Sequence, residues 1–211
     1  EPKPYVVVEG LLGFSTRAMR NNYDVKIYLD PEEELRIRWK VIRDTSKRGY
    51  SEEQVTASLK KRKNDSPAFI QPQRTFADMA IQFYRPQGME DEIGPALNVK
   101  HTLRPTLPHP DLTSLLDVGE STGITLDLAR DKDGKPVDIL DINGSIETQR
   151  ASKIEELLWG LIPEAQHMRE NTRSIEELEK INIISHPLML TQLLVAYHMV
   201  RPHWDIMRSE G

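Results

Sequence analysis

The chain has 211 residues and a mass of 24.3 kDa, enough for one large domain or two small ones. It carries 28 Lys and Arg against 33 Asp and Glu, and this acidic balance argues against a general nucleic-acid-binding protein. No run approaches the roughly 20 apolar residues of a membrane helix, so we expect neither a nucleic-acid partner nor a membrane partner. The absence of cysteine excludes disulfides and a thiol nucleophile, and it is compatible with the cytoplasmic location that we expect.

Residues 1–86 alternate predicted strands and helices. Apolar runs and alternation predict strands at 5–8, 25–29 and 78–84. Between the last two, the acidic run 32–34 begins a helix that ends near Gly49, and Ser51 with Gln54 forms the capping box of a second helix. Strands separated by helices predict an α/β fold with a mainly parallel sheet.

Residues 85–97, which are rich in proline, glycine and acidic residues, form the predicted domain boundary. We therefore assign residues 1–86 to a first unit and residues 87–211 to an α+β extension. In the extension, strands are predicted at 99–103, 123–129 and 136–142, and helices at 146–161 and 188–200. The last helix is apolar on most sides, so we expect it to be covered by the chain's own core or by a second copy in a homodimer.

The helix after Asp30 carries two stripes of residues. Leu35, Trp39 and Ile42 are predicted to face the core. Cations form the second stripe, at Arg36, Lys40, Arg43 and Lys47, and Arg48 follows. Such a stripe is either a solvated face with ordinary ion pairs or an anion site. The second interpretation gains support because the helix follows the carboxyl end of a strand, where open parallel sheets bind ligands.

The order of several short motifs resembles the phosphoribulokinase and uridine kinase family of P-loop kinases. The resemblance is carried by Val8-Glu9-Gly10-Leu11, by residues 25–30, by Trp39-Lys40-Val41-Ile42-Arg43-Asp44 continuing to Lys47-Arg48-Gly49-Tyr50, by Ile70-Gln71-Pro72-Gln73, and by Ala77-Asp78. The Trp39-Lys40 pair and the long extension, with 135–140 and 185–198, are more similar to phosphoribulokinase than to uridine kinase. The resemblance implies a partial P-loop kinase sheet in residues 1–86 and a phosphoribulokinase-like extension in residues 87–211.

The resemblance also implies roles for individual residues. Glu9 matches the acidic residue that ends the Walker B strand and helps to hold Mg²⁺. The implied catalytic residues are Lys40, Arg43 and Arg48, the implied ATP-binding residues are Arg43, Lys47 and Arg48, and Lys61 and Arg62 are the implied contacts of a small phosphorylated sugar. Asp44 is expected to orient Arg43 or Arg48. Cations suit this chemistry because phosphoryl transfer depends on positioning and on electrostatic stabilisation of the phosphate oxygens.

Two departures from the family pattern limit these expectations. The sequence contains no Gly-x-x-x-x-Gly-Lys-Ser/Thr loop to cradle phosphates, and Leu12 stands where the family usually has a histidine. We therefore expect the chain to be the C-terminal part of a kinase and to be inactive alone. The parent protein is expected to phosphorylate ribulose 5-phosphate, with ATP and Mg²⁺. A kinase of the same family acting on uridine or another small alcohol, and a non-catalytic binding or oligomerisation module, remain the alternatives.

Overall fold

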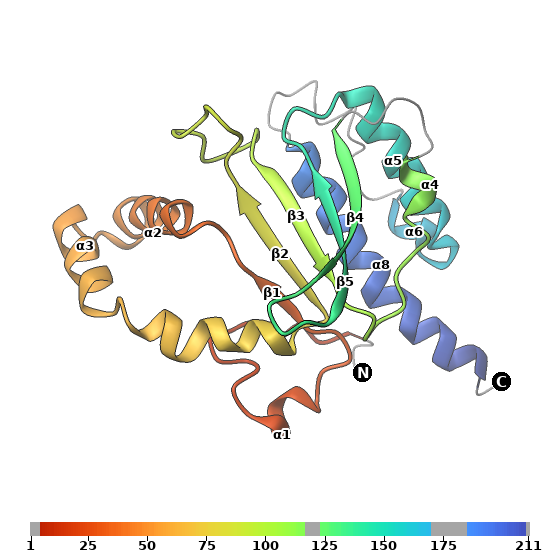
Figure 1. Cartoon of the computed structure of the whole chain (residues 1–211), viewed down its shortest axis with the longest axis horizontal. Coiled ribbons are helices and arrows are strands. Elements are labelled where there is room, and N and C mark those ends of the chain that lie inside the picture. The colour runs from red at the N-terminus through yellow and green to blue at the C-terminus, as the bar shows by residue number, and fades with distance from the viewer. Residues whose placement is uncertain (1–4, 117–122, 170–184, 210–211) are drawn as a thin grey trace.

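A five-stranded sheet forms the centre of the computed structural model, which describes residues 5–116, 123–169 and 185–209 (Figure 1). The strands are β1 (Ile27–Leu29), β2 (Met79–Tyr84), β3 (Asn98–Leu103), β4 (Ile124–Arg130) and β5 (Pro136–Ile142), in the spatial order β1-β2-β3-β5-β4. Strands β1 and β2 are parallel, whereas the β2–β3, β3–β5 and β4–β5 pairs are antiparallel. The predicted α/β fold is confirmed, with its parallel pairing in residues 1–86 and antiparallel strands added by the extension.

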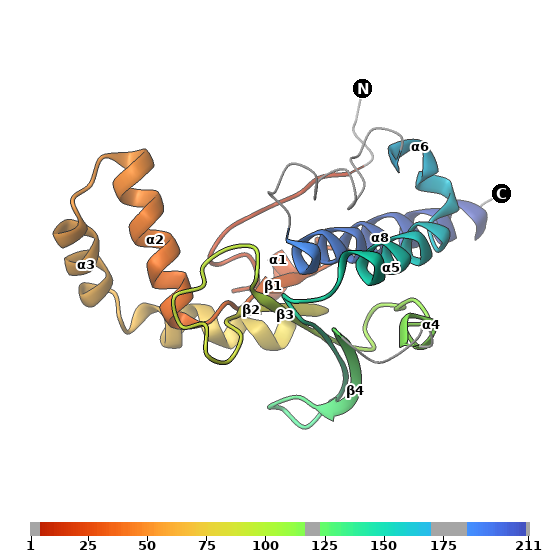
Figure 2. The ribbon, with the colours of Figure 1, turned by 90° about the horizontal axis from the view of Figure 1, so that it is seen from above.

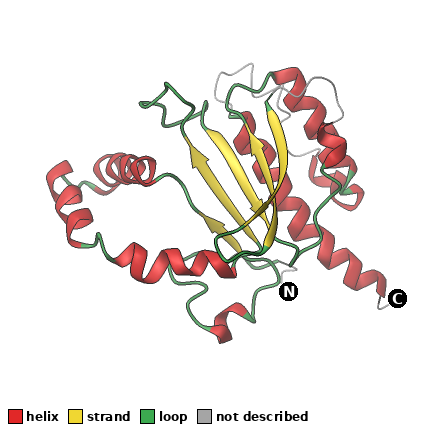
Figure 3. Ribbon diagram, in the orientation of Figure 1, coloured by secondary structure: helices red, strands yellow, loops and turns green. Residues whose placement is uncertain are grey.

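The helices lie beside the sheet and on one of its faces (Figure 3). They are α1 (Arg17–Arg20), α2 (Glu33–Arg48), α3 (Glu52–Lys61), the π-helix η1 (Ser66–Ile70), the 3₁₀ helix η2 (Gln71–Phe76), α4 (Thr113–Leu116), α5 (Thr148–Gly160), the 3₁₀ helix η3 (Pro163–Ala165), α6 (Gln166–Arg169) and α8 (His186–Ser209). Local signals set these bounds as predicted: Gly49 ends α2 with φ 72°, and Ser51 caps α3 through the predicted capping box. In the part of the chain that is described, no helix is long and apolar enough to cross a membrane.

The hydrophobic core lies between the sheet and the two long helices of the extension. Figure 2 shows α5 and α8 side by side on one face of the sheet. Alternate strand residues point toward them because successive side chains of a strand point to opposite faces. The core includes Met79, Ile81, Val99, Leu103, Ile124, Leu140 and Ile142 from the strands, and Ile154, Leu158, Leu190 and Leu194 from the helices. The apolar C-terminal helix is thus covered on its sheet-facing side by the chain itself.

The strand predicted at residues 5–8 is wrong. This segment has no regular structure, and Val6, Val7 and Val8 are 83%, 78% and 63% exposed. A strand needs a neighbour for its backbone hydrogen bonds, and across the described residues no strand pairs with this segment. The apolar run therefore keeps its strand composition without a sheet to join.

The sheet is continuous across the predicted domain boundary. Residues 85–97 connect β2 to β3, which pair antiparallel from Met79↔Leu103 to Tyr84↔Asn98. The division into residues 1–86 and 87–211 stays a prediction, and in the structure both segments contribute strands to one sheet.

A fully buried histidine joins the sheet to α8. His101 of β3 has no exposed surface, and its Nε2 lies 2.9 Å from Thr191 Oγ1. Because the Thr191 hydroxyl donates to the Pro187 carbonyl, it accepts from His101 Nε2, and the ring is neutral with its proton on that nitrogen. Burial is the main cause that lowers the pKa of His101 to about 4, and the nearby His198 ring contributes in the same direction.

We expect this buried ring to make folding stability depend on pH. The pKa in the folded state lies below the ordinary value of roughly 6.5, so the unfolded chain binds more protons and the free energy of unfolding falls as the pH drops from about 6.5 toward 4. The loss attributable to this ring is at most on the order of 3 kcal/mol. Urea unfolding from pH 4 to pH 8 measures it.

The His101→Gln variant should show a flatter profile over that pH range, because it lacks the titrating ring. His167→Gln, which changes an exposed histidine, is the matched control and should keep the wild-type profile. Equal pH profiles for all three proteins would contradict the assignment.

Candidate active site

The first half of α2 is held against the end of β2 and the following loop. Arg85 contacts Glu32 over 3.1 Å and Glu34 over 2.7 Å, which fixes the start of the helix. One turn further, Trp39 Nε1 donates to the Ile93 carbonyl over 2.8 Å. The helix therefore leaves the sheet from a defined position.

The second half of α2 projects past the sheet (Figure 1). Leu35 is completely buried, as predicted, but Ile42 is 47% exposed, so its predicted place in the core is wrong. The reason is geometric: the helix moves away from the sheet after its first turns, and its apolar stripe no longer has a surface to contact. Arg36, the first cation of the predicted stripe, pairs with Glu33.

Three cations of α2 converge on one carboxylate, that of Asp44. Lys40 Nζ and Arg43 Nε donate to Asp44, the second over 2.9 Å, and Arg48 Nη1 lies 3.3 Å from Asp44 Oδ1. Residues 40, 44 and 48 stand one turn apart, so their side chains share one side of the helix. Asp44 has a side chain that is 4% exposed, whereas those of Arg43 and Arg48 are 49% and 55% exposed.

The charge of this group is strongly positive. Hydrogen bonds from Arg43 and Lys40 lower the pKa of Asp44 to about 2, so the carboxylate stays ionised at neutral pH. One negative charge then stands among three positive ones, and the two half-exposed guanidinium groups remain accessible to a ligand. A planar guanidinium matches the oxygens of a phosphate, which makes this group a candidate phosphate site.

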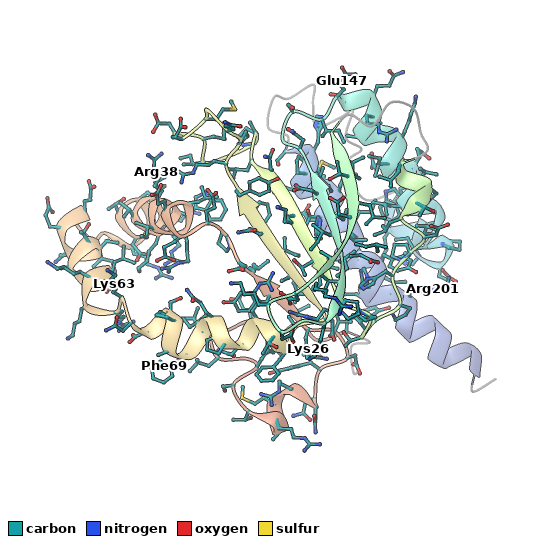
Figure 4. All side chains as sticks on the ribbon, viewed as in Figure 1. Lys26, Arg38, Lys63, Phe69, Glu147 and Arg201 are labelled. Atoms are coloured by element: carbon teal, nitrogen blue, oxygen red, sulfur yellow. The ribbon has the colours of Figure 1, made fainter. Side chains whose placement is uncertain are left out.

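The other predicted site residues lie outside this group. Lys47 is exposed on the same helix, and Lys61 and Arg62 are exposed at the end of α3. Between β1 and β2 the chain leaves the sheet and returns to it, and we call this segment, residues 30–74, the excursion. Figure 4 labels Lys63, which follows Lys61 and Arg62 on the excursion. Glu9 is exposed near the N-terminus, and within the described ranges no hydrogen bond or ion pair joins it to Lys40, Arg43 or Arg48.

Two buried polar contact sets beside η2 were not predicted from the sequence. Arg74 and Arg104 meet Asp131 of the β4–β5 turn in one set, and Gln73 forms the other with backbone groups of residues 11, 14 and 69. The side chains of Gln73, Arg104 and Asp131 are almost completely buried. The one signal in the sequence was the run Ile70-Gln71-Pro72-Gln73, which marked the place but not the partners.

Two parallel strands with a cation-bearing helix between them in the chain define the class as an α/β protein with a site suited to phosphate groups. Residues 1–89 match the model of the Phosphoribulokinase / Uridine kinase family, so this part of the chain is similar to members of that family.

Curated relatives carry the two names in the family title. The chain is 39% identical over 100 residues to a phosphoribulokinase of Synechocystis sp., a match covering 47% of this chain and 30% of that protein. It is 31% identical over 174 residues to the chloroplastic phosphoribulokinase of Chlamydomonas reinhardtii, covering 75% of this chain and 45% of that protein. A uridine kinase of Staphylococcus haemolyticus is 35% identical over 108 residues, 51% of this chain and 49% of that protein. The chain spans less than half the length of each of these relatives.

Removing the Asp44 carboxylate should loosen α2. In Asp44→Asn the three cations repel one another without a compensating charge, so we expect lower stability and faster amide hydrogen exchange in residues 40–50. Raising the ionic strength should reduce the difference from the wild type, because salt screens exposed charges. Asp127→Asn, which changes an exposed carboxylate on β4, is the control. Unchanged exchange in residues 40–50 would show that the carboxylate does not hold the cations.

Proposed function

We propose that the chain is the C-terminal part of an ATP-dependent kinase whose phosphate acceptor is ribulose 5-phosphate. The observation that carries this proposal is the convergence of Lys40, Arg43 and Arg48 on the buried Asp44 carboxylate. The kinase names of the relatives support the class of reaction, and the matches to phosphoribulokinases over residues of the extension support the acceptor. A cytoplasmic location stays a prediction.

The three cations suit the chemistry of phosphoryl transfer. In that reaction negative charge spreads over the transferring phosphoryl group, and fixed positive groups stabilise it. Asp44 holds the cations in place without reacting, since it stays ionised and hydrogen-bonded. Arg43 and Arg48, each about half exposed, would contact the phosphate oxygens of ATP, with Lys47 nearby on the same helix.

The fit to a metal is limited to one residue. Among the described residues no three His, Asp or Glu side chains come together as metal ligands. Protein-bound Mg²⁺ commonly uses one or two carboxylates together with substrate phosphates, and Glu9 would supply one such oxygen. The metal would neutralise phosphate charge when bound.

Two alternatives stay open. The same cations would serve a kinase of uridine or another small alcohol, because they would contact ATP and not the acceptor. A non-catalytic binding or oligomerisation module is the second alternative, since the sequence lacks a P-loop. A Walker A motif encoded in frame upstream of Glu1 would favour the kinase.

The 211-residue chain alone should not turn over ATP with ribulose 5-phosphate or uridine. It lacks the phosphate-cradling loop and its lysine, and a coupled assay for ADP with each acceptor checks this. Measurable phosphorylation by the purified chain would overturn the proposal that a further segment is required.

In the full-length protein, Arg48→Ala and Lys40→Ala should lower kcat by about 10²-fold or more while changing the KM for ATP much less. That pattern is expected when contacts are lost in the transition state. Arg17→Ala, an exposed arginine of α1, is the control and should leave both constants unchanged. A rise in KM at constant kcat would assign the cations to ground-state binding.

We further propose that the protein forms a homodimer. The apolar side of α8 is largely covered within the chain, so the support comes from β4, whose outer edge is unpaired in the described sheet and whose Leu128 is 88% exposed. An unpaired strand edge is a surface to which a second sheet can add.

Light scattering at several concentrations tests the dimer. We expect a mass near twice 24.3 kDa at tens of micromolar, and Leu128→Lys should shift it toward one chain by placing a charge at the interface. A steady mass near 24.3 kDa would reject the dimer.

A further inference from the structure

The 3₁₀ helix η2 stands where the chain returns from α2, α3 and η1 to the sheet. It spans Gln71–Phe76 and leads directly into β2. A 3₁₀ helix has three residues per turn, so side chains three apart lie on the same side. Gln73 and Phe76 therefore share one side of η2, and Arg74 and Thr75 point in other directions.

Gln73 fastens the segment that follows Glu9. Its side chain is almost fully buried, and its Oε1 accepts from the Phe14 backbone N–H over 2.8 Å. Its Nε2 donates to the carbonyls of Leu11, over 3.0 Å, and Phe69, over 2.7 Å. One amide group thus uses both of its donor hydrogens and its acceptor, and two of these three hydrogen bonds reach 59 and 62 residues along the chain.

A second contact from the same side of η2 reaches the same segment. The guanidinium group of Arg20 lies 3.8 Å from the centre of the Phe76 ring, a cation–π distance. Arg20 also donates to the Phe14 carbonyl over 2.6 Å. Both backbone groups of Phe14 are therefore held, one by Gln73 and the other by an arginine stacked on η2.

Arg74 fastens two other parts of the chain. Its Nε donates over 3.0 Å to Asp30, which lies between β1 and α2. Its Nη1 donates over 2.9 Å to Asp131 in the β4–β5 turn, and its Nη2 lies 3.2 Å from the Thr102 hydroxyl of β3. Residues 30 and 74 are the two ends of the excursion that carries the cations, so this side chain ties those ends together and to the extension.

Arg104 supports this arrangement from behind. It is 3% exposed, and it donates to Asp131 and to the backbone carbonyls of Arg74 and Ala77. Asp131 therefore receives two arginines, and its pKa is lowered despite its burial, because the Lys132 N–H and both arginines favour the carboxylate. Arg74 is thus held by hydrogen bonds at both its side chain and its backbone carbonyl, which together fix its position.

We propose that Gln73 and Arg74 are positioning residues of the kinase proposed above. Gln73 sets the place of the turn after Glu9, and Arg74 sets the direction in which α2 carries Lys40, Arg43 and Arg48. Both would act through the segments that they hold, because their contacts are with backbone and side chains of those segments. The inference rests on the proposed function for its catalytic consequence, whereas the two contact sets are separate features of this chain.

Amide hydrogen exchange on the 211-residue chain tests the two contact sets without any activity. Gln73→Ala removes two hydrogen bonds to residues 11 and 14, so it should raise exchange in residues 11–20 by about fivefold or more and leave residues 124–137 unchanged. Arg74→Gln should show the opposite pattern: exchange becomes faster in residues 126–137 and 30–36 and stays unchanged in residues 11–20. Gln71→Ala and Arg17→Gln change exposed residues of the same types and serve as controls.

A uniform rise across the chain in both variants would mean general destabilisation and would overturn the proposal, as would no change in either. A conservative variant guards against misfolding. Arg74→Lys keeps the charge and loses the planar guanidinium, so it should give a smaller effect confined to the same segments.

The catalytic consequence is measured in the full-length protein. Gln73→Ala and Arg74→Gln should lower kcat by about 10- to 100-fold at nearly unchanged ATP affinity, and Arg74→Lys should recover part of the loss. Unchanged kcat in an active enzyme would overturn the positioning role. An inactive wild-type parent would instead reject the proposed function, and the exchange pattern would still decide the contacts.

Discussion

Every chemical argument about this chain depends on one ion group, the three cations of α2 around the Asp44 carboxylate. Three positive side chains on one side of a helix destabilise it unless a negative group lies among them. Asp44 is that group: it is buried, and its pKa of about 2 keeps it charged. The same arrangement leaves two arginines half exposed and an excess of positive charge, so the contact that stabilises the helix also prepares it for an anion.

The strands and helices were largely predictable because their signals are local. The strand predicted at 136–142 has the bounds of β5, and the Ser51 capping box predicted the start of α3. The two errors share one cause: Tyr5–Val8 and Ile42 have apolar patterns without a neighbouring surface, and a pattern cannot report whether its partner is there. Among the site residues, the cations of α2 were predictable from helical spacing. The contacts of Gln73 and Arg74 were not, since they join residues about 30 to 60 positions apart.

The sheet continues across residues 85–97, which the sequence predicted to be a boundary between two domains. Composition marks residues 85–97 as a linker, yet β2 and β3 on either side pair over six residues each, and both strands contribute to one core. The extension therefore adds strands to the sheet of the first segment. Because the β4–β5 turn also receives Arg74, the extension contacts the two ends of the excursion that carries α2. A substitution in the β4–β5 turn would therefore alter the contacts of Arg74, and through Asp30 the position from which α2 starts.

The choice of phosphate acceptor must come from residues other than the α2 cations. The relatives are named phosphoribulokinase and uridine kinase, and on the proposed function the group around Asp44 would contact the phosphates of ATP whichever acceptor is used. A phosphorylated sugar carries a charge that uridine lacks, so a site selective for it needs further cations, and leaving those cations unpaired would disfavour the neutral acceptor. Lys61 and Arg62, exposed at the end of α3, are the residues of this chain suited to that task. On the proposed function, α2 would carry the ATP contacts and α3 the acceptor contacts, and a movement of the segment that holds both helices would bring the two sets to the reaction together.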